Sequence, residues 1–267
     1  LIYCPAAKPS IKFSDKTTAI DKYAFYKSSI EKMELPDSLE TIGKMAFMTS
    51  AVRYLEFPAT MKAIDQEAFF NAQLRSVDLN EGLETIGDRA FSVSHVVGIT
   101  IPASVKSIGE GAFDYDYSGD RYIVIKGSST ELAKDAIPYY YALDVYAPSG
   151  SKTEIFVKNE KESRGDKCKM VFHSLDEFKE AASITLGEND IRLSRQETKT
   201  LTVTVSPEGA RIPAVVWSSS DKNIVKVTDK GEITGIEPGT AEVTARAGRL
   251  TAVCKVTVVK KEGESDF

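Results

Sequence analysis

The sequence predicts a mainly β chain in which a short repeat solenoid is followed by a β-sandwich. Three observations lead to this prediction: a repeat of 22 residues in the N-terminal part, the loss of that period after Tyr117, and short alternating strands between glycines and prolines from Ile184 onward. They divide the chain into a solenoid with a C-terminal cap over residues 1–148, a connector over 149–183, and a sandwich over 184–267.

The repeat shows most clearly in five segments that align without a gap. They are residues 20–25, 42–47, 64–69, 86–91 and 108–113, each beginning with Ile and ending with Ala-Phe. Upstream of each segment, two apolar residues alternate, as in Met33 and Leu35, so both point to one face of a short strand. Because one repeat buries too little apolar surface to fold alone, the coils must stack and share a core.

Turn residues recur in the same register as the apolar positions. Proline follows the strand in three repeats and ends it, since it cannot donate to a ladder. Gly43, Gly87 and Gly109 follow the next apolar column, and we expect them to supply unusual backbone angles there. We expect the recurrent Phe to fill the interior and the small Ala before it to let coils pack closely.

This pattern resembles the BspA-like class of bacterial leucine-rich repeats over about residues 8–117. The resemblance implies a surface-exposed or secreted bacterial protein, because members of the class have these locations and some act in adhesion. The sequence departs from the class after the Ala-Phe turn, where many members carry Cys or Asn. Here the turns carry Met48, Phe70 and Ser92.

The cap is predicted from the region where the period fails. Residues 122–125 and 142–146 are expected to form strands, with a short helix over 129–136 between them. Tyr139, Tyr140 and Tyr141 lie in this region. They are interpreted as packing residues of the cap, with an aromatic platform for sugar as the alternative.

The connector is expected to contain a hairpin and a short helix. Residues 154–157 and 169–172 flank a charged turn and predict the hairpin. Ser174 and Glu177 have the spacing of a capping box, which predicts a helix over 175–182. The turn contains Arg-Gly-Asp at 164–166, a tripeptide of integrin ligands that is also ordinary turn chemistry.

The C-terminal part is predicted to be all β. Alternating strands are expected at residues 201–205, 215–217, 224–227, 242–245 and 255–258. Over about residues 184–260 the order and spacing of motifs strongly resemble the group-two bacterial immunoglobulin-like domain, which implies a spacer or an adhesive module. Trp217 is expected in the core, and Cys254 has no partner cysteine in an opposing strand.

Composition and motifs argue against several classes of function. The net charge of −5 disfavours nucleic acid and anionic membranes, and no apolar run approaches the ~20 residues of a spanning helix. We find no HExxH motif, no zinc-type cluster and no phosphate-cradling glycine loop. Cys168 and His173 could form a nucleophile–base pair, but no orienting partner is apparent. We therefore expect no enzyme activity, no cofactor and no metal.

One outward surface of the solenoid stands out by its charge. The residues between the inward apolar pairs are Lys12, Glu34, Glu56, Asp78 and Thr100, and the neighbouring outward column is Ser10, Lys32, Tyr54, Ser76 and Gly98. Three carboxylates at strand spacing repel one another. On another face, Glu40, Lys62, Glu84 and Lys106 alternate in sign. The contrast predicts a candidate binding surface comprising Lys32, Glu34, Tyr54, Glu56 and Asp78.

These observations favour a cell-surface or secreted binding protein that presents its solenoid sheet to a protein or a glycan. The alternative is a structural spacer or accessory component without a ligand of its own. We expect a monomer outside a bacterial cell, with the signal sequence removed, since the chain begins at Leu1 rather than Met. Cys4 as a lipid-anchored residue is a further alternative that Tyr3 disfavours.

Overall fold

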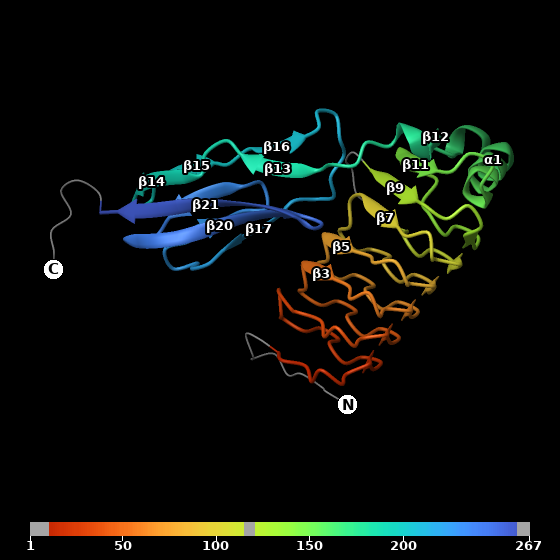
Figure 1. The fold of residues 1–267 in the computed structure, drawn as a ribbon, viewed down its shortest axis with the longest axis horizontal. Helices are drawn as coiled ribbons and strands as arrows, with labels where there is room; N and C mark the ends of the chain where they lie inside the picture. Colours follow the sequence, from red (N-terminus) through yellow and green to blue (C-terminus); the bar gives the residue numbers. More distant parts are fainter. Residues whose placement is uncertain (1–10, 115–120, 261–267) are drawn as a thin grey trace. The chain divides into compact units, whose positions relative to one another are not determined.

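The computed structural model describes residues 11–114 and 121–260, and the chain divides into two compact units, Leu1–Phe178 and Lys179–Phe267. In the first unit, successive coils stack so that each coil places its strands beside those of its neighbours (Figure 1). This confirms the predicted solenoid. Cys4 and the N-terminal start lie outside the described residues.

The strands of the first unit form two parallel columns. The first column consists of β3 (Tyr54–Glu56), β5 (Ser76–Asp78), β7 (Ile99–Ile101), β9 (Tyr122–Ile125), β11 (Leu143–Ala147) and β12 (Met170–Ser174). In it, β3 pairs with β5, and the other four pair in the order β7-β9-β11-β12. The second column is a six-stranded sheet of β1 (Ala19–Ile20), β2 (Thr41–Ile42), β4 (Ala63–Ile64), β6 (Thr85–Ile86), β8 (Ser107–Ile108) and β10 (Glu131–Leu132).

The core between the columns contains a stack of phenylalanine rings. Phe25, Phe47, Phe69, Phe91 and Phe113 lie one above another, with centroids 4.9–5.4 Å apart and planes within 12° of parallel. Backbone bonds hold this spacing, since Phe47 N donates to Ala68 O (2.7 Å) and Phe69 N to Ala90 O (2.8 Å). The predicted interior position of the Phe is confirmed, because Phe69 is fully buried.

The recurrent glycines have a different role from the predicted one. Gly43, Gly87 and Gly109 lack the left-handed backbone, which falls instead two residues later in each coil, as at Met45 (φ 56°) and Glu67 (φ 57°). A Cβ at Gly87 would lie 2.6 Å from Gln66 N of the preceding coil. The glycine is therefore required because two coil backbones approach each other, not because of its own φ.

The helix predicted over residues 129–136 is wrong, whereas the strands on either side of it are confirmed as β9 and β11. The segment forms β10 and a turn, with Leu132 in register with Ile108. Glu131 N donates to Lys106 O and Ala133 N to Ile108 O, each at 2.9 Å. This coil is two residues longer than the repeat, which hides it from the period. Bonds to the neighbouring coil prevail over local helix propensity.

The predicted hairpin in the connector is also wrong. Its first half is the helix α1 (Lys152–Arg164), followed by the 3-10 turn η1 (Gly165–Lys167), and its second half is β12, which pairs in parallel with β11. Ser151 starts the helix by accepting a bond from Glu154 N (3.3 Å), and the i, i+4 pair Thr153 and Val157 is buried. The connector thus continues the first unit up to Phe178.

The capping box at Ser174 and Glu177 is present, but it starts only the 3-10 turn η2 (Leu175–Glu177). The helix predicted to continue to residue 182 does not form. Instead, Glu180 makes a β-bridge with Arg211.

The second unit is a β-sandwich, as predicted. Its strands are β13 (Ser183–Leu186), β14 (Asp190–Ser194), β15 (Thr198–Thr200), β16 (Val203–Ser206), β17 (Val216–Ser219), β18 (Val225–Val227), β19 (Glu232–Gly235), β20 (Gly239–Ala247) and β21 (Leu250–Val259). They form the sheets β14-β21-β20-β17, β15-β19-β18 and β13-β16. Trp217 is buried in the core as predicted, against Gly231, whose φ of +79° and close approach to the indole both exclude a larger residue.

Candidate binding surface on the repeat sheet

The structure brings the candidate residues into two rows on the outward face of the first strand column. Lys32 forms a parallel β-bridge with Tyr54. In the backbone register of β3 and β5, Tyr54 lies opposite Ser76 and Glu56 lies opposite Asp78. This register places Glu34 at the level of Glu56. Inward neighbours such as Leu55 are fully buried, so the alternation assumed in the sequence argument is present.

The members of the two rows differ in exposure. Lys32, Glu34 and Glu56 are exposed, whereas Tyr54 and Asp78 are half-buried and Ser76 is buried. The Tyr54 hydroxyl donates to Glu56 Oε2 at 3.3 Å, which links the rows. The surface therefore offers carboxylates at its edge and a partly covered phenol beside them.

Two arginines flank this surface and were missed by the sequence argument. Arg53 and Arg75 occupy the same position in adjacent coils, and Arg75 N donates to Arg53 O at 2.9 Å. Burial lowers the pKa of Arg53 from its ordinary value, the charge of Arg75 lowers it further, and Glu31 raises it. The repeat itself contained the signal, since the two positions differ by 22 residues.

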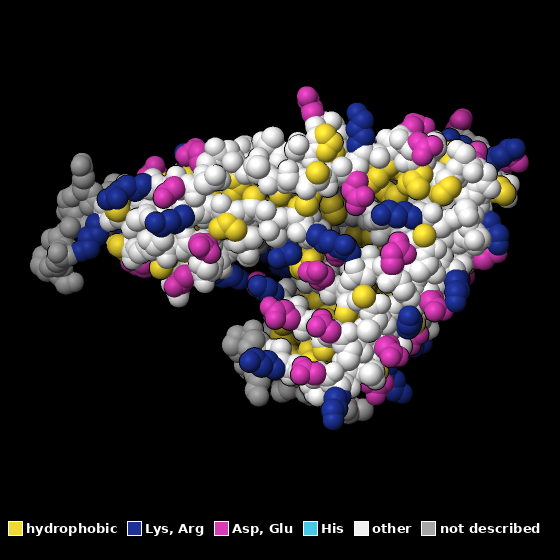
Figure 2. All heavy atoms as spheres, in the orientation of Figure 1, with side chains coloured by type: hydrophobic (Ala, Val, Ile, Leu, Met, Phe, Trp, Pro, Cys, Tyr) yellow, Lys and Arg dark blue, Asp and Glu magenta, His cyan; other side chains and the backbone are white. Residues whose placement is uncertain are grey.

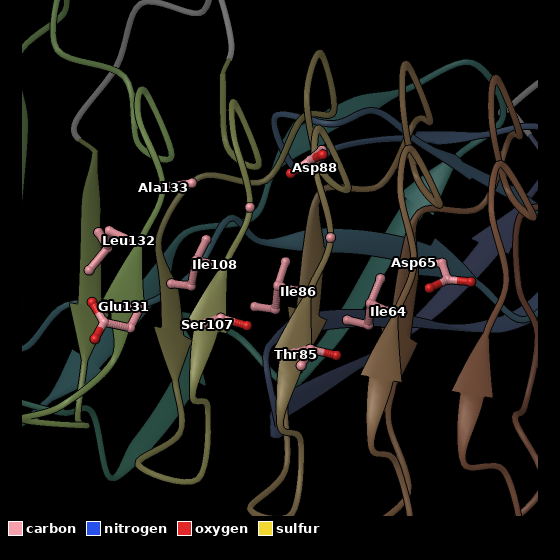
Figure 3. Close-up of a pocket in the computed structure, with 12 residues that line it drawn as sticks. Ile64, Asp65, Thr85, Ile86, Asp88, Ser107, Ile108, Glu131, Leu132 and Ala133 are labelled. Carbon is pink, nitrogen blue, oxygen red and sulfur yellow. The ribbon is translucent and has the colours of Figure 1, made fainter.

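The second strand column carries a shallow, open depression with a volume of about 410 Å³. Figure 3 shows Thr85, Ser107 and Glu131 at equivalent places on its neighbouring strands. Two of the three carboxylates that line it have structural partners: Asp88 accepts a bond from Glu110 N at 2.8 Å, and Glu131 pairs with Lys152. We therefore do not propose the depression as a ligand-binding site.

Comparison with known families agrees with the folds of the two units. Residues 3–119 match the BspA type leucine-rich repeat region in six copies, and residues 180–258 match the bacterial Ig-like domain of group 2. The chain joins a BspA-type leucine-rich repeat region to a group 2 bacterial Ig-like domain. Both families are consistent with surface or binding proteins, and both are typically non-enzymatic.

Individual relatives match only part of this chain. An uncharacterized protein of Clostridium acetobutylicum is 37% identical over 83 residues, which is 30% of this chain and 9% of that protein. An alpha-L-arabinofuranosidase of Bifidobacterium longum is 40% identical over 72 residues, which is 26% of this chain and 7% of that enzyme. The chain thus spans less than a tenth of either relative.

A solved leucine-rich repeat protein from Bacteroides ovatus is similar at a TM-score of 0.33 and 16% identity. The match covers 69% of this chain and 62% of that one.

The possible nucleophile–base pair of the repeat region is not assembled. His173 directs Nε2 to Asp144 Oδ1 (3.0 Å) and Nδ1 to Glu177 Oε2 (3.5 Å), so both ring nitrogens face carboxylates rather than Cys168. In the Ig-like domain, burial raises the pKa of the Cys254 thiol, which disfavours the reactive thiolate.

Among the described residues there is no metal-binding cluster of His, Cys, Asp or Glu and no helix able to cross a membrane.

Tyr139 of the cap packs against Arg164 of the Arg-Gly-Asp tripeptide. The Arg164 guanidinium lies 3.7 Å from the Tyr139 ring centroid, pairs with Asp135 Oδ1 at 2.5 Å and also pairs with Glu160. The bond to Glu160 raises the pKa of Arg164. The Tyr140 hydroxyl donates to Asp114. These contacts favour the packing interpretation over a sugar platform or an integrin ligand.

Proposed function

We propose that the leucine-rich repeat region is the binding module of a bacterial cell-surface or secreted protein. It engages a protein or a glycan through Lys32, Glu34, Tyr54, Glu56 and Asp78. The observation that carries this proposal is the register of β3 and β5, which aligns the acidic row on one outward face with Glu34 and Glu56 exposed. Repeat proteins bind most often on such a face, because neighbouring coils display side chains there in regular columns.

A second row of the same repeats gives the contrast. Glu84 pairs with Lys106 at 2.6 Å, and this partner lowers the pKa of Glu84. Oppositely charged neighbours in register compensate one another, as expected of a surface that only faces solvent. Figure 2 shows acidic and basic side chains interspersed along the repeat region. The row of Glu34, Glu56 and Asp78 differs in that carboxylates lie in register with carboxylates, as Glu56 does with Asp78.

The test is a screen of the full chain against host-matrix proteins and a glycan array. A ligand found there is then measured with the Tyr54→Ala/Glu56→Gln variant, and we expect affinity to fall about tenfold or more. Glu84→Gln is the control, because it removes a half-buried carboxylate from the other face. Equal loss in both variants would contradict the assigned surface.

The competing function is a structural spacer or accessory component without a ligand, and the presence of an Ig-like domain favours it. If neither screen finds a ligand for the folded protein, this result would support the alternative. We propose a monomer in either case, which size-exclusion chromatography with light scattering would check.

A further inference from the structure

Beyond β7, the outward face of the first strand column is no longer mainly charged and polar but carries apolar and aromatic side chains. The register aligns Thr100, Val124, Tyr146 and His173 in one row and Tyr122, Asp144 and Val171 in the other. Val145 and Ile123, on the opposite side of the same strands, belong to the main core. Tyr122, Val124 and Tyr146 instead form a separate apolar cluster on the outward face.

These three outward residues are nevertheless buried, with exposed fractions of 6%, 0% and 7% in the order just given. Leu175 and Phe178 pack against them. The Phe178 ring lies 5.5 Å from the Tyr122 ring and 5.1 Å from the Tyr146 ring. The chain therefore returns over the sheet that it has just left and covers the face with its own side chains.

His173, in the strand β12, links the sheet to this returning segment through Glu177. His173 stacks on Tyr146 with centroids 4.8 Å apart and also faces Asp144 and Glu177. Glu177 in turn accepts a bond from Ser174 N at 3.2 Å, within the capping box. The segment is thus held by a hydrogen-bonded turn at its start and by an aromatic side chain at its end.

We infer that residues 174–178 are a strap that occupies the C-terminal part of the outward sheet face as a built-in ligand. The strap covers an apolar site (the seat) formed by Tyr122, Val124 and Tyr146. Its side chains Leu175 and Phe178 pack against that site. Another polypeptide could bind at Tyr122, Val124 and Tyr146 only if one of its apolar side chains displaced the strap. On the proposed function, other ligands are confined to the face of β3 and β5. The covering of the seat does not depend on that function.

Hydroxyl-radical footprinting of the full chain tests the strap, with oxidation of each tyrosine read by mass spectrometry. In the native protein we expect Tyr122 and Tyr146 to be protected, while Tyr23, which is 46% exposed, reacts readily. The Leu175→Ser/Phe178→Ser variant should raise oxidation of Tyr122 and Tyr146 several-fold toward the level of Tyr23. Ile155→Ser, which changes an exposed side chain of α1, should leave both tyrosines protected.

Glu177→Gln is a milder second variant, since it weakens the contact with His173 without removing an apolar group. It should raise oxidation of Tyr146 to a smaller extent, and it decides the question if the double variant fails to fold. Native tyrosines that react like Tyr23, or protection unchanged in both variants, would overturn the strap. Neither result depends on ligand binding, so failure of the proposed function would be seen separately in the binding screen.

Discussion

The repeat region and the Ig-like domain reach a buried core by different routes. In the repeat region, strands pair with strands of adjacent coils, as in Ile42↔Ile64. In the Ig-like domain, β14 pairs with β21, which places Asp190 beside Lys255. The first fold can therefore be inferred from a period in the sequence, whereas the second depends on the order of strands and turns over the whole domain.

The two cores also differ in composition. The interior of the repeat region contains the same Phe in successive coils, whereas Trp217 belongs to a core of unlike residues such as Val225, Ile233 and Val243. A substitution in the repeat core removes one member of a stack, with a neighbour on either side. The chain also provides its own reporters, since its one Trp lies in the second unit and its 11 Tyr lie in the first.

The largest expected effect follows from the stack. Phe69→Ala leaves a cavity between Phe47 and Phe91 and should lower the free energy of unfolding of the repeat region by about 3–5 kcal/mol. Chemical denaturation followed by tyrosine fluorescence should show the shift, while the Trp217 transition stays in place. A loss below about 1 kcal/mol would contradict the assigned core. A matching shift at Trp217 would show that the two units unfold together.

The second prediction separates two uses of glycine, one in each unit. Gly87→Ala should destabilise by up to about 3 kcal/mol, because its Cβ meets the backbone of the preceding coil. Gly209→Ala should cost about 1–2 kcal/mol through its φ of +77° alone, since nothing lies within 4 Å of the added atom. Substitution by Asn distinguishes the causes in thermal melts. Asn tolerates the left-handed region and should restore stability at Gly209 but not at Gly87.

These glycines show what the sequence could and could not predict. The register of Lys32, Tyr54 and Ser76 followed from the period, because stacked coils keep equivalent residues at one level. The role of Gly87 did not, because close approach of two backbones is a property of the stack and not of the residue's own segment. Similarly, the position of residues 154–157 beside a charged turn predicted a strand, although Ser151 and Glu154 already had the spacing of a helix start.

For the candidate surface, the alignment of its residues could be predicted from the sequence, but their exposure could not. The two outward rows required only the repeat and the alternation of a strand. The exposure of each member required the packing, which leaves Glu56 exposed and Asp78 half-buried. The strap could not be predicted, because Phe178 meets Tyr122 and Tyr146 only after the chain turns back at η2.

A third prediction concerns the start of the Ig-like domain. The sequence placed it at residue 184, but Lys179 O accepts a bond from Arg211 N at 3.0 Å and Ala182 N donates to Ser206 O at 2.8 Å. We expect residues 179–267 to fold alone as an all-β unit. The fragment 184–267 should be less stable by about 2 kcal/mol, since each lost backbone bond contributes about 1 kcal/mol. Denaturation followed at Trp217 compares the two fragments, and equal midpoints would restore the boundary at 184.

The smallest expected effect tests whether the acidic row differs from the compensated row. Glu34, Glu56 and Asp78 lie at neighbouring levels, so replacing them with Gln, Gln and Asn removes repulsion worth less than about 1 kcal/mol. The melting temperature should rise slightly at low salt, and the gain should vanish at high salt because ions screen exposed charges. Glu84→Gln is the control and should give no gain, because it removes the partner of Lys106. A triple variant that melts lower at low salt would show that these carboxylates are structurally paired, and the acidic row would then lose its claim as a binding surface.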